Sequence, residues 1–154
     1  MMIEEKLKRL KIKYDIVEHL AVYTVEEAKQ KVPKINGIGC KNLFLKTKKK
    51  EYFLYTLPKD KQISLEKLAE TLNLTRFHFA SSSSLEEILG VIAGSVTPLA
   101  IANDAENKVT VILDKELIGK KVLVHPNRNT ATISIEYNDL IKFIKSENHK
   151  IIEI

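Results

Sequence analysis

The sequence predicts a single α+β domain, built on a mixed, mostly antiparallel sheet with helices packed against it. The chain has 154 residues, the usual size of one domain. Its hydrophobic fraction of 44% and charged fraction of 29% are typical of a globular protein. Strand-like and helical patterns interleave irregularly, without a repeat, a low-complexity tract or a Pro/Gly-rich linker. We therefore expect one domain over residues 1–154.

The first half of the chain predicts three helices and four strands. In order, these are helix 3–10, strand 14–18, helix 24–32, strands 40–47 and 51–57, helix 65–72 and strand 76–80. The first helix has Ile and Leu at helical spacing with charges on its other face. The second begins with a capping box, Thr24 followed by Glu27, and Pro33 ends it. Ser64 is the expected cap of the third helix. The expected strands are runs rich in β-forming residues. The glycines and Asn of segment 36–39 predict a loop.

The second half is richer in strand. In order, it predicts helix 84–90, strands 99–102, 109–113, 122–125 and 130–135, and a closing helix 137–148. Ser84 with Glu87 repeats the capping-box pattern, and Gly90 ends that helix. Turn signals at 104–107 and 126–129 separate the strands of each pair. The closing helix carries its apolar residues on one face.

Composition excludes several classes of protein. No apolar run approaches the ~20 residues that a membrane helix needs, and the first residues lack a signal-peptide core. The single cysteine, Cys40, cannot form an intramolecular disulfide. We therefore expect a cytoplasmic protein without a membrane partner. The net charge of +5 favours polyanionic partners if the basic residues cluster on one face.

Neither a metal site nor a nucleotide-cofactor site is predicted. Zinc sites need Cys and His in close pairs, whereas the four histidines are scattered and Cys40 stands alone. Neither of the usual glycine-rich phosphate loops occurs. A nucleophilic pair of Cys40 and His125 is an alternative, although a lone cysteine beside a strand is more often a small buried hydrophobe.

Three segments carry polar groups that a plain scaffold does not need. They are Lys-Asn at the start of the apolar run 41–45, the loop Gly-Ser-Val-Thr-Pro at 94–98, and His125-Pro126 followed by Asn-Thr-Ala-Thr at 129–132. Each alone has a structural explanation, such as an edge-strand charge, turn residues or a strand-end histidine. Taken singly, the structural explanation is favoured for each.

The three segments resemble the YbaK/ProX superfamily of trans-editing aminoacyl-tRNA deacylases, and the match extends from His19 and segment 22–28 to the last helix. They are most similar to the ProXp-ala (PrdX) branch, which removes alanine from mischarged tRNA-Pro. The resemblance implies a YbaK/ProX-like fold and a hydrolase acting on Ala-tRNA(Pro) without metal or cofactor. It implies binding of the acceptor stem and 3′ end of tRNA-Pro. Prolyl-tRNA synthetase and an elongation factor are candidate protein partners.

The resemblance also implies roles for particular residues. Lys41 is the residue implied to carry activity. The residues implied to bind the aminoacyl group are Asn42, Gly94, Ser95, Val96, Thr97, Pro98, Val124 and His125. Lys46 and Arg76 are implied to contact the acceptor stem. With the hairpin lysines Lys48, Lys49 and Lys50, they are expected to cluster beside the mouth of the pocket and follow the RNA phosphates.

The implied reaction is ester hydrolysis at the 3′ end of a tRNA. Negative charge develops on the carbonyl oxygen, and backbone N–H groups of a glycine-containing loop suit that oxygen. Lys41 has two possible roles, as a general base with a lowered pKa or as a cation. The cationic role is favoured because the motif holds no carboxylate to position a water. The ribose hydroxyl of the substrate then accepts the proton, as the resemblance implies.

A pocket built for proline cannot strongly exclude the smaller alanine, because a missing methylene changes the binding free energy by only ~1–3 kcal/mol. The editing enzyme is therefore expected to distinguish the two amino acids by size. A second pocket too small for proline solves this problem, and Val124 and the loop 94–98 are its expected walls.

Three alternatives stay open. One is a deacylase of Cys-tRNA(Pro), of the YbaK type. A non-catalytic RNA-binding module is the second, but such modules expose stacking aromatic residues. Phe44, Phe53 and Phe79 lie in apolar runs and are expected in the core. A regulatory or partner-binding protein is the third.

Overall fold

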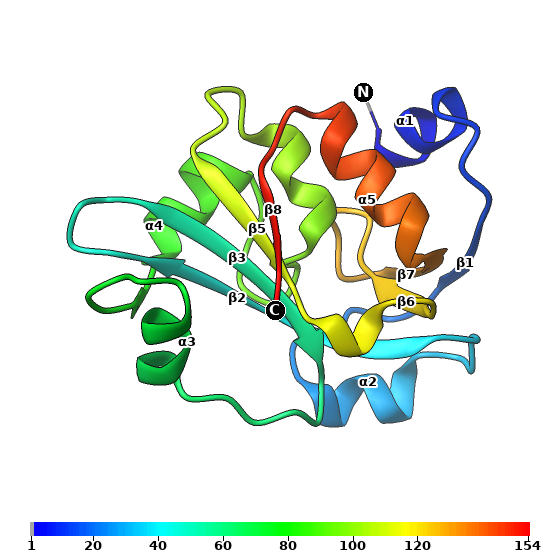
Figure 1. Ribbon diagram of the computed structural model, residues 1–154. Coiled ribbons are helices and arrows are strands. Elements are labelled where there is room, and N and C mark those ends of the chain that lie inside the picture. The colour runs from blue at the N-terminus through cyan, green and yellow to red at the C-terminus, as the bar shows by residue number, and fades with distance from the viewer. Residues whose placement is uncertain (1) are drawn as a thin grey trace.

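One mixed sheet organises the molecule (Figure 1). The computed structural model describes residues 2–154, except for the side chain of Val25. Its strands are β1 (Tyr14–Glu18), β2 (Ile38–Lys46), β3 (Tyr52–Pro58), β4 (His78–Phe79), β5 (Val109–Leu113), β6 (Lys121–Val124), β7 (Ala131–Glu136) and β8 (Ile151–Glu153). Their order is β1-β7-β6-β2-β3-β5-β8, and β4 pairs with β2. The predicted α+β class with a mixed sheet is confirmed.

Antiparallel and parallel pairs both occur. The antiparallel pairs are β1–β7, β6–β7, β2–β3 and β2–β4, and the parallel pairs are β2–β6, β3–β5 and β5–β8. Strand β2 therefore joins the two halves of the sheet, since β6 and β4 contact one edge and β3 the other.

Helices cover both sides of the sheet. They are α1 (Ile3–Arg9), α2 (Val25–Lys31), α3 (Leu65–Thr71), α4 (Ser82–Ser84) with the π-helical turn Leu85–Leu89, the 3-10 turns Pro98–Asn103 and Lys115–Leu117, and α5 (Tyr137–Ser146). Figure 1 shows α1 and α5 on one side and α2 and α3 on the other. The larger core cluster packs under α1, α5 and Pro98–Asn103, and a smaller one under α3. Within residues 2–154, no helix has the length and apolar character that crossing a membrane requires.

Two predicted helix starts are confirmed by their caps. The Thr24 hydroxyl accepts from the Glu27 N–H at 3.1 Å, and Ser64 accepts from the Lys67 N–H at 3.3 Å. The Glu27 carboxylate accepts from the Tyr23 N–H at 3.4 Å, which fixes the chain as it enters α2. The bonds of Thr24 and Glu27 fix the first turn of α2.

Two element predictions in the middle of the chain are wrong. The expected strand 99–102 is a 3-10 helix, because Pro98 occupies its first turn and Thr97 caps it by accepting from the Leu99 N–H at 3.3 Å. The expected cap Ser84 lies inside the helix, since Ser81 accepts from the Ser84 N–H at 3.1 Å and the helix begins at Ser82. The apolar run 99–102 is compatible with either a strand or a helix, and any of the serines at 81–84 can be a helix cap.

Smaller differences concern element boundaries. The expected strand 76–80 shortens to β4, and Ile38 and Gly39 of the expected loop belong to β2. The last strand, β8, was not predicted from the sequence. It is three residues long and pairs with β5 only after α5 has returned the chain to that edge. Such a strand depends on a distant partner more than on its own pattern.

Strand β2 has an open stretch that positions the site. On one edge it pairs with β6 at Ile38 and Gly39 and with β4 at Leu45 and Lys46. Among residues 2–154, no strand pairs with the stretch between them on that edge. Backbone groups of successive residues alternate between the two edges of a strand. The Gly39 carbonyl accepts from the Lys59 N–H beyond the end of β3, so the backbone groups of even-numbered residues, such as Asn42, point to the open edge.

Candidate functional site

The three predicted segments meet at a cavity of about 230 Å³ beside the open edge of β2. Lys41 and Asn42 come from β2, Gly94 and Val96 from the loop before the 3-10 helix, and His125 from the end of β6. The remaining lining residues are Val22, Tyr23, Thr24, Ala28 and Cys40. The fold thus brings together residues that lie more than 50 positions apart in the sequence.

Four of the residues predicted to bind the aminoacyl group are buried and do not line this cavity. They are Ser95, Thr97, Pro98 and Val124. Val124 is only 2% exposed and packs in the larger core cluster, because it points to the opposite face of β6 from Leu123 and His125. From the sequence we expected Val124 to be a wall of the cavity, and that expectation is wrong. Val22, Tyr23 and Val96 stand there instead.

The Asn42 side chain is bonded to the loop 94–98 and to β3, so its amide is not free to bind a ligand. Its side-chain N–H donates to the Val96 carbonyl at 3.1 Å, and its side-chain oxygen accepts from the Thr56 hydroxyl at 2.6 Å. Thr56 lies opposite Asn42 on β3 and is fully buried. The amide therefore links the rigid hairpin to the loop, and we treat Asn42 as a positioning residue.

Two lining residues of the loop, Gly94 and Val96, have backbone N–H groups that are candidates for binding a ligand. Gly94 has φ of +91°, a conformation that L residues rarely adopt. The Ser95 N–H donates to the Ile92 carbonyl at 3.0 Å, which leaves it unavailable to a ligand. The N–H groups of Gly94 and Val96 have no acceptor in the part of the chain that the structure describes. These two are the candidate donors to an anionic oxygen.

Lys41 supplies the positive charge of the cavity. It is half-buried on β2, opposite Leu57 of β3. No carboxylate lies within ion-pair distance of its ammonium among residues 2–154. An unpaired ammonium at a concave site attracts an anionic or polarised oxygen.

His125 presents one ring nitrogen to the site. Nδ1 lies 3.0 Å from the Ala131 carbonyl, so Nδ1 carries the proton and Nε2 is left as an acceptor in the neutral ring. Burial lowers the pKa of His125, the bond to Ala131 opposes that effect, and the nearby His19 adds to the lowering. The ring is therefore neutral at pH values where free histidine is partly charged.

We expect the acid limb of the pH–rate profile to lie below the ordinary histidine pKa of ~6.5. A substrate hydrogen bond to Nε2 is lost when the ring is protonated, and the lowered pKa moves that loss to lower pH. His125→Asn keeps a donor near the Ala131 carbonyl but removes the titrating group. We expect kcat/KM of the variant to fall about tenfold and its pH–rate profile to lose the acid limb. An unchanged limb in His125→Asn contradicts this role.

The nucleophilic alternative at Cys40 is disfavoured. Burial raises the pKa of Cys40 to about 12, so the thiol is protonated at neutral pH. Its Sγ donates weakly to the Ile38 carbonyl at 3.4 Å. Cys40 therefore acts as a small wall residue of the cavity.

The polar residues at 129–132 hold the segment that closes the cavity. The Asn129 side chain donates to the Val22 carbonyl at 3.1 Å, and the Thr132 hydroxyl lies 2.9 Å from His19 Nε2. These bonds fix the chain that leads into Tyr23 and α2. The role of Tyr23 was missed because its segment shows only a helix cap in the sequence. The only signal in the sequence was the capping box, which fixes the backbone at the start of α2, next to the cavity.

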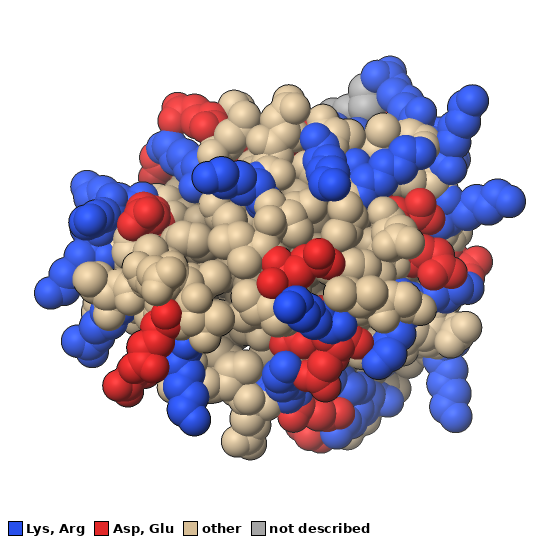
Figure 2. All heavy atoms as spheres, viewed as in Figure 1, with Lys and Arg blue, Asp and Glu red and all other residues tan. Residues whose placement is uncertain are grey.

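The predicted basic cluster does not lie at the mouth of the cavity. At ~3.3 Å per residue, Lys46 is about 17 Å along β2 from Lys41, and the turn with Lys48, Lys49 and Lys50 is further away. In Figure 1 that turn projects at the left, whereas α2 lies at the lower right. Figure 2 shows Lys and Arg at the left end, and others along the top and right of the same face. These lysines therefore do not line the cavity, because the extended strand carries the turn away from Lys41, and their contact with RNA stays a prediction.

Two more residues belong to this distant end. Arg76 is exposed just before β4, and β4 places His78 beside Lys46. Phe79 is 61% exposed, so its expected place in the core is wrong, whereas Phe44 and Phe53 are buried as predicted. An exposed ring beside basic residues suits contact with RNA.

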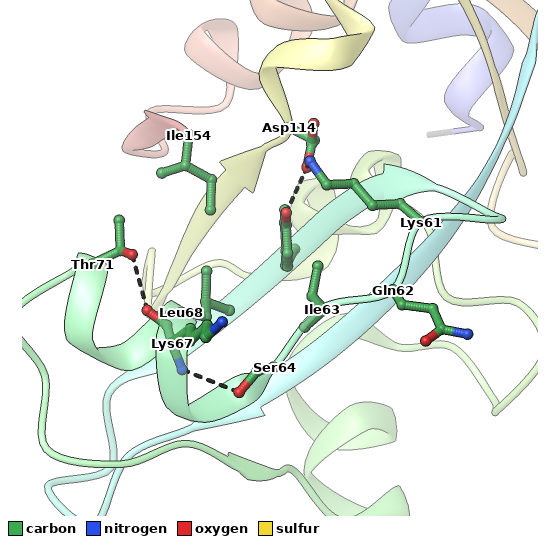
Figure 3. A pocket seen from close by; sticks show the side chains of 10 residues that line it. Lys61, Gln62, Ile63, Ser64, Lys67, Leu68, Thr71, Asp114 and Ile154 are labelled. Atoms are coloured by element: carbon green, nitrogen blue, oxygen red, sulfur yellow. Dashed lines mark hydrogen bonds and ion pairs between the residues drawn. The ribbon is translucent and has the colours of Figure 1, made fainter.

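A larger hollow of about 450 Å³ holds none of the predicted site residues (Figure 3). It lies between α3, Lys61 and the C-terminal Ile154. The buried Asp114 accepts from the Tyr55 hydroxyl at 2.6 Å and pairs with Lys61 at 2.9 Å. Tyr55, Asp114 and Lys61 are thus bonded to one another, and the bond from Tyr55 holds β3 to the chain after β5.

Comparisons with known proteins agree with one another. Residues 19–143 match the family model described as "Aminoacyl-tRNA editing domain". The chain is 38% identical to the prolyl-tRNA editing protein ProX of Acetoanaerobium sticklandii, over 94% of this chain and 89% of that protein. It is 39% identical to prolyl-tRNA synthetase associated domain-containing protein 1 of Danio rerio, over 96% and 82%.

A solved structure shows the same fold. The crystal structure of a candidate trans-editing enzyme for prolyl tRNA synthetase superposes with a TM-score of 0.73. The alignment covers 98% of this chain and 92% of that one, at 19% sequence identity.

Proposed function

Because the chain belongs to the aminoacyl-tRNA editing domain family, we propose that it removes alanine from mischarged tRNA-Pro. Editing hydrolyses the ester between an amino acid and the 3′ end of a tRNA, so the chain is an aminoacyl-tRNA deacylase and tRNA is its substrate. The observation that carries the finer proposal is the cavity of about 230 Å³, which combines Lys41, His125 and the N–H groups of the loop. The relative named as a prolyl-tRNA editing protein supports tRNA-Pro as the tRNA.

The residues of the cavity match the parts of an ester. The N–H groups of Gly94 and Val96 and the ammonium of Lys41 stabilise the negative charge that develops on the carbonyl oxygen. Water adds to the carbonyl carbon, the bond to the ribose oxygen breaks, and that oxygen takes a proton. The free ribose hydroxyl of the substrate relays the proton, which leaves Lys41 charged throughout. The products are free alanine and a tRNA with an intact 3′ end.

Size selects the amino acid in this proposal. The side-chain part of the cavity is bounded by Val22, Tyr23 and Val96. Val96 is held by Asn42 and Val22 by Asn129, so both walls resist displacement. A methyl group fits where the ring of proline meets these walls, and rigid packing makes the clash costly.

The test is a deacylation assay on tRNA-Pro charged with Ala, Ser, Cys or Pro. We expect the alanyl ester to be hydrolysed at least about tenfold faster than the prolyl ester, in line with ~1–3 kcal/mol of steric discrimination. Faster hydrolysis of the cysteinyl ester assigns the alternative substrate. Equal rates for the alanyl and prolyl esters overturn the size argument, and binding without hydrolysis of any ester overturns the deacylase mechanism.

A further inference from the structure

The turn between α2 and β2 contains the dipeptide Asn36-Gly37, for which the sequence predicts only a loop. This is the one place in the chain where asparagine directly precedes glycine. Both residues are exposed. Asparagine is a thermolabile residue, because the backbone nitrogen that follows it can attack its side-chain amide. Glycine in the next position removes the Cβ that would hinder this attack.

Both reacting groups of this turn are free. Within residues 2–154, the Asn36 side chain has no hydrogen-bond partner and the Gly37 N–H has no acceptor. Asn73, in the turn after α3, is equally exposed but differs in both respects that matter. The next N–H, that of Leu74, donates to the Ala69 carbonyl at 2.8 Å, and leucine carries a branched side chain. The chain therefore contains a reactive asparagine and an exposed reference for it.

We propose that Asn36 is a site of spontaneous modification to isoaspartate. The Gly37 nitrogen forms a bond to Asn36 Cγ, the bond from Cγ to Nδ2 breaks, and Nδ2 leaves as ammonia with the proton of the Gly37 N–H. Water then opens the cyclic imide. Opening at one carbonyl gives aspartate, and opening at the other gives isoaspartate, in which the main chain runs through the former side chain. Water is the only reactant consumed.

Isoaspartate lengthens the main chain by one methylene at a point that is fixed on one side. The chain after Asn36 enters β2, where Ile38 pairs with β6. Gly37 cannot shift towards the sheet, since an atom in the place of its Cβ would lie 2.7 Å from Leu123 Cδ2. The added length must therefore be accommodated before Gly37, where the Asn36 carbonyl accepts from the Ser134 hydroxyl. Loss of this bond releases the segment that leads back to α2.

Helix α2 has little packing that would resist such a displacement. None of its described side chains is fully buried. Elements with few buried contacts move at a low cost in free energy. Ala28 of α2 lines the cavity that contains Lys41 and His125, so a shift of the helix changes the shape of that cavity. We expect the modified protein to be a poorer deacylase, and this consequence rests on the proposed function, whereas the modification itself does not.

The modification is tested by ageing the purified protein for days at mildly alkaline pH. Isoaspartate is located by labelling with an isoaspartyl carboxyl methyltransferase and by mass spectrometry of peptides. We expect it to form at Asn36 at least about tenfold faster than at Asn73, because only Asn36 is followed by a free glycine N–H. Asn36→Gln is the control and is expected to take no label at this position. A rate at Asn36 no higher than at Asn73 overturns the inference.

The consequence is tested by deacylation of alanyl-tRNA. Protein that carries isoaspartate at position 36 is expected to lose about tenfold in kcat/KM, as small misplacements around a site do. The Asn36→Asp variant carries the new acid on a normal backbone and is expected to keep its activity. Full activity of the isoaspartyl protein overturns the effect through α2, and equal losses in both assign the effect to charge instead. Fresh protein that hydrolyses no aminoacyl-tRNA rejects the proposed function, whereas the labelling result stands independently.

Discussion

Lys41→Met is expected to lower kcat for alanyl-tRNA by about 10²–10³-fold, the loss typical of removing one group that stabilises an oxyanion. Lys41 is half-buried, lines the cavity with Gly94 and His125, and has no carboxylate partner among residues 2–154 that would neutralise its charge. Methionine keeps most of the length and packing of the stem and removes only the charge. Single-turnover deacylation measures the effect, and thermal unfolding shows that the fold persists.

A second substitution separates the two roles of Lys41. Arginine keeps the positive charge but cannot act as a base, so Lys41→Arg retains part of the activity if the cation is what matters. Lys121→Met is the matched control, since Lys121 is a half-buried strand lysine on β6 that does not line the cavity of Lys41. Turnover close to normal in Lys41→Met removes the residue from the site, and an inactive Lys41→Arg with unchanged stability favours the general base.

The parts of the fold that were predictable are those in which local chemistry decides the conformation. Thr24 and Ser64 cap their helices through residues three positions away, and the hairpin of β2 and β3 has its lysine turn where the pattern ends. The 3-10 helix after Thr97 resembles a strand in sequence because its residues 98–101 are all buried and therefore apolar. Strand β8 exists because β5 offers an edge, which short-range patterns do not encode.

The candidate site was predictable to the same extent. Motifs identify residues that carry unusual polar groups, and Lys41, Gly94 and His125 do line one cavity. Motifs do not say which face of a strand a residue occupies, and for that reason Val124 was expected at a wall although it lies in the core. Tyr23 was not singled out as a wall residue, because the chain before it is held by Asn129 and Thr132, which lie more than 100 positions away in the sequence.

Gly94→Ala is expected to reduce kcat/KM for alanyl-tRNA by about 10²-fold and to destabilise the protein by roughly 1–2 kcal/mol. The φ of +91° is unfavourable for any residue with a Cβ, and this Cβ would lie 3.1 Å from Tyr23 Cδ1. The ring of Tyr23 or the loop must therefore move, and either movement displaces a wall of the cavity or the two N–H donors. Steady-state kinetics and thermal unfolding measure the two effects separately.

Gly119→Ala is the matched control for backbone strain, because Gly119 has a similar φ of +78° but no atom within 4 Å of an added Cβ. Both variants are expected to lose comparable stability, since both place a side chain at positive φ. Only Gly94→Ala is expected to lose activity, because only there does the side chain press on the cavity. If the two variants retain equal activity at equal stability, close packing of Gly94 against Tyr23 is not what shapes the site.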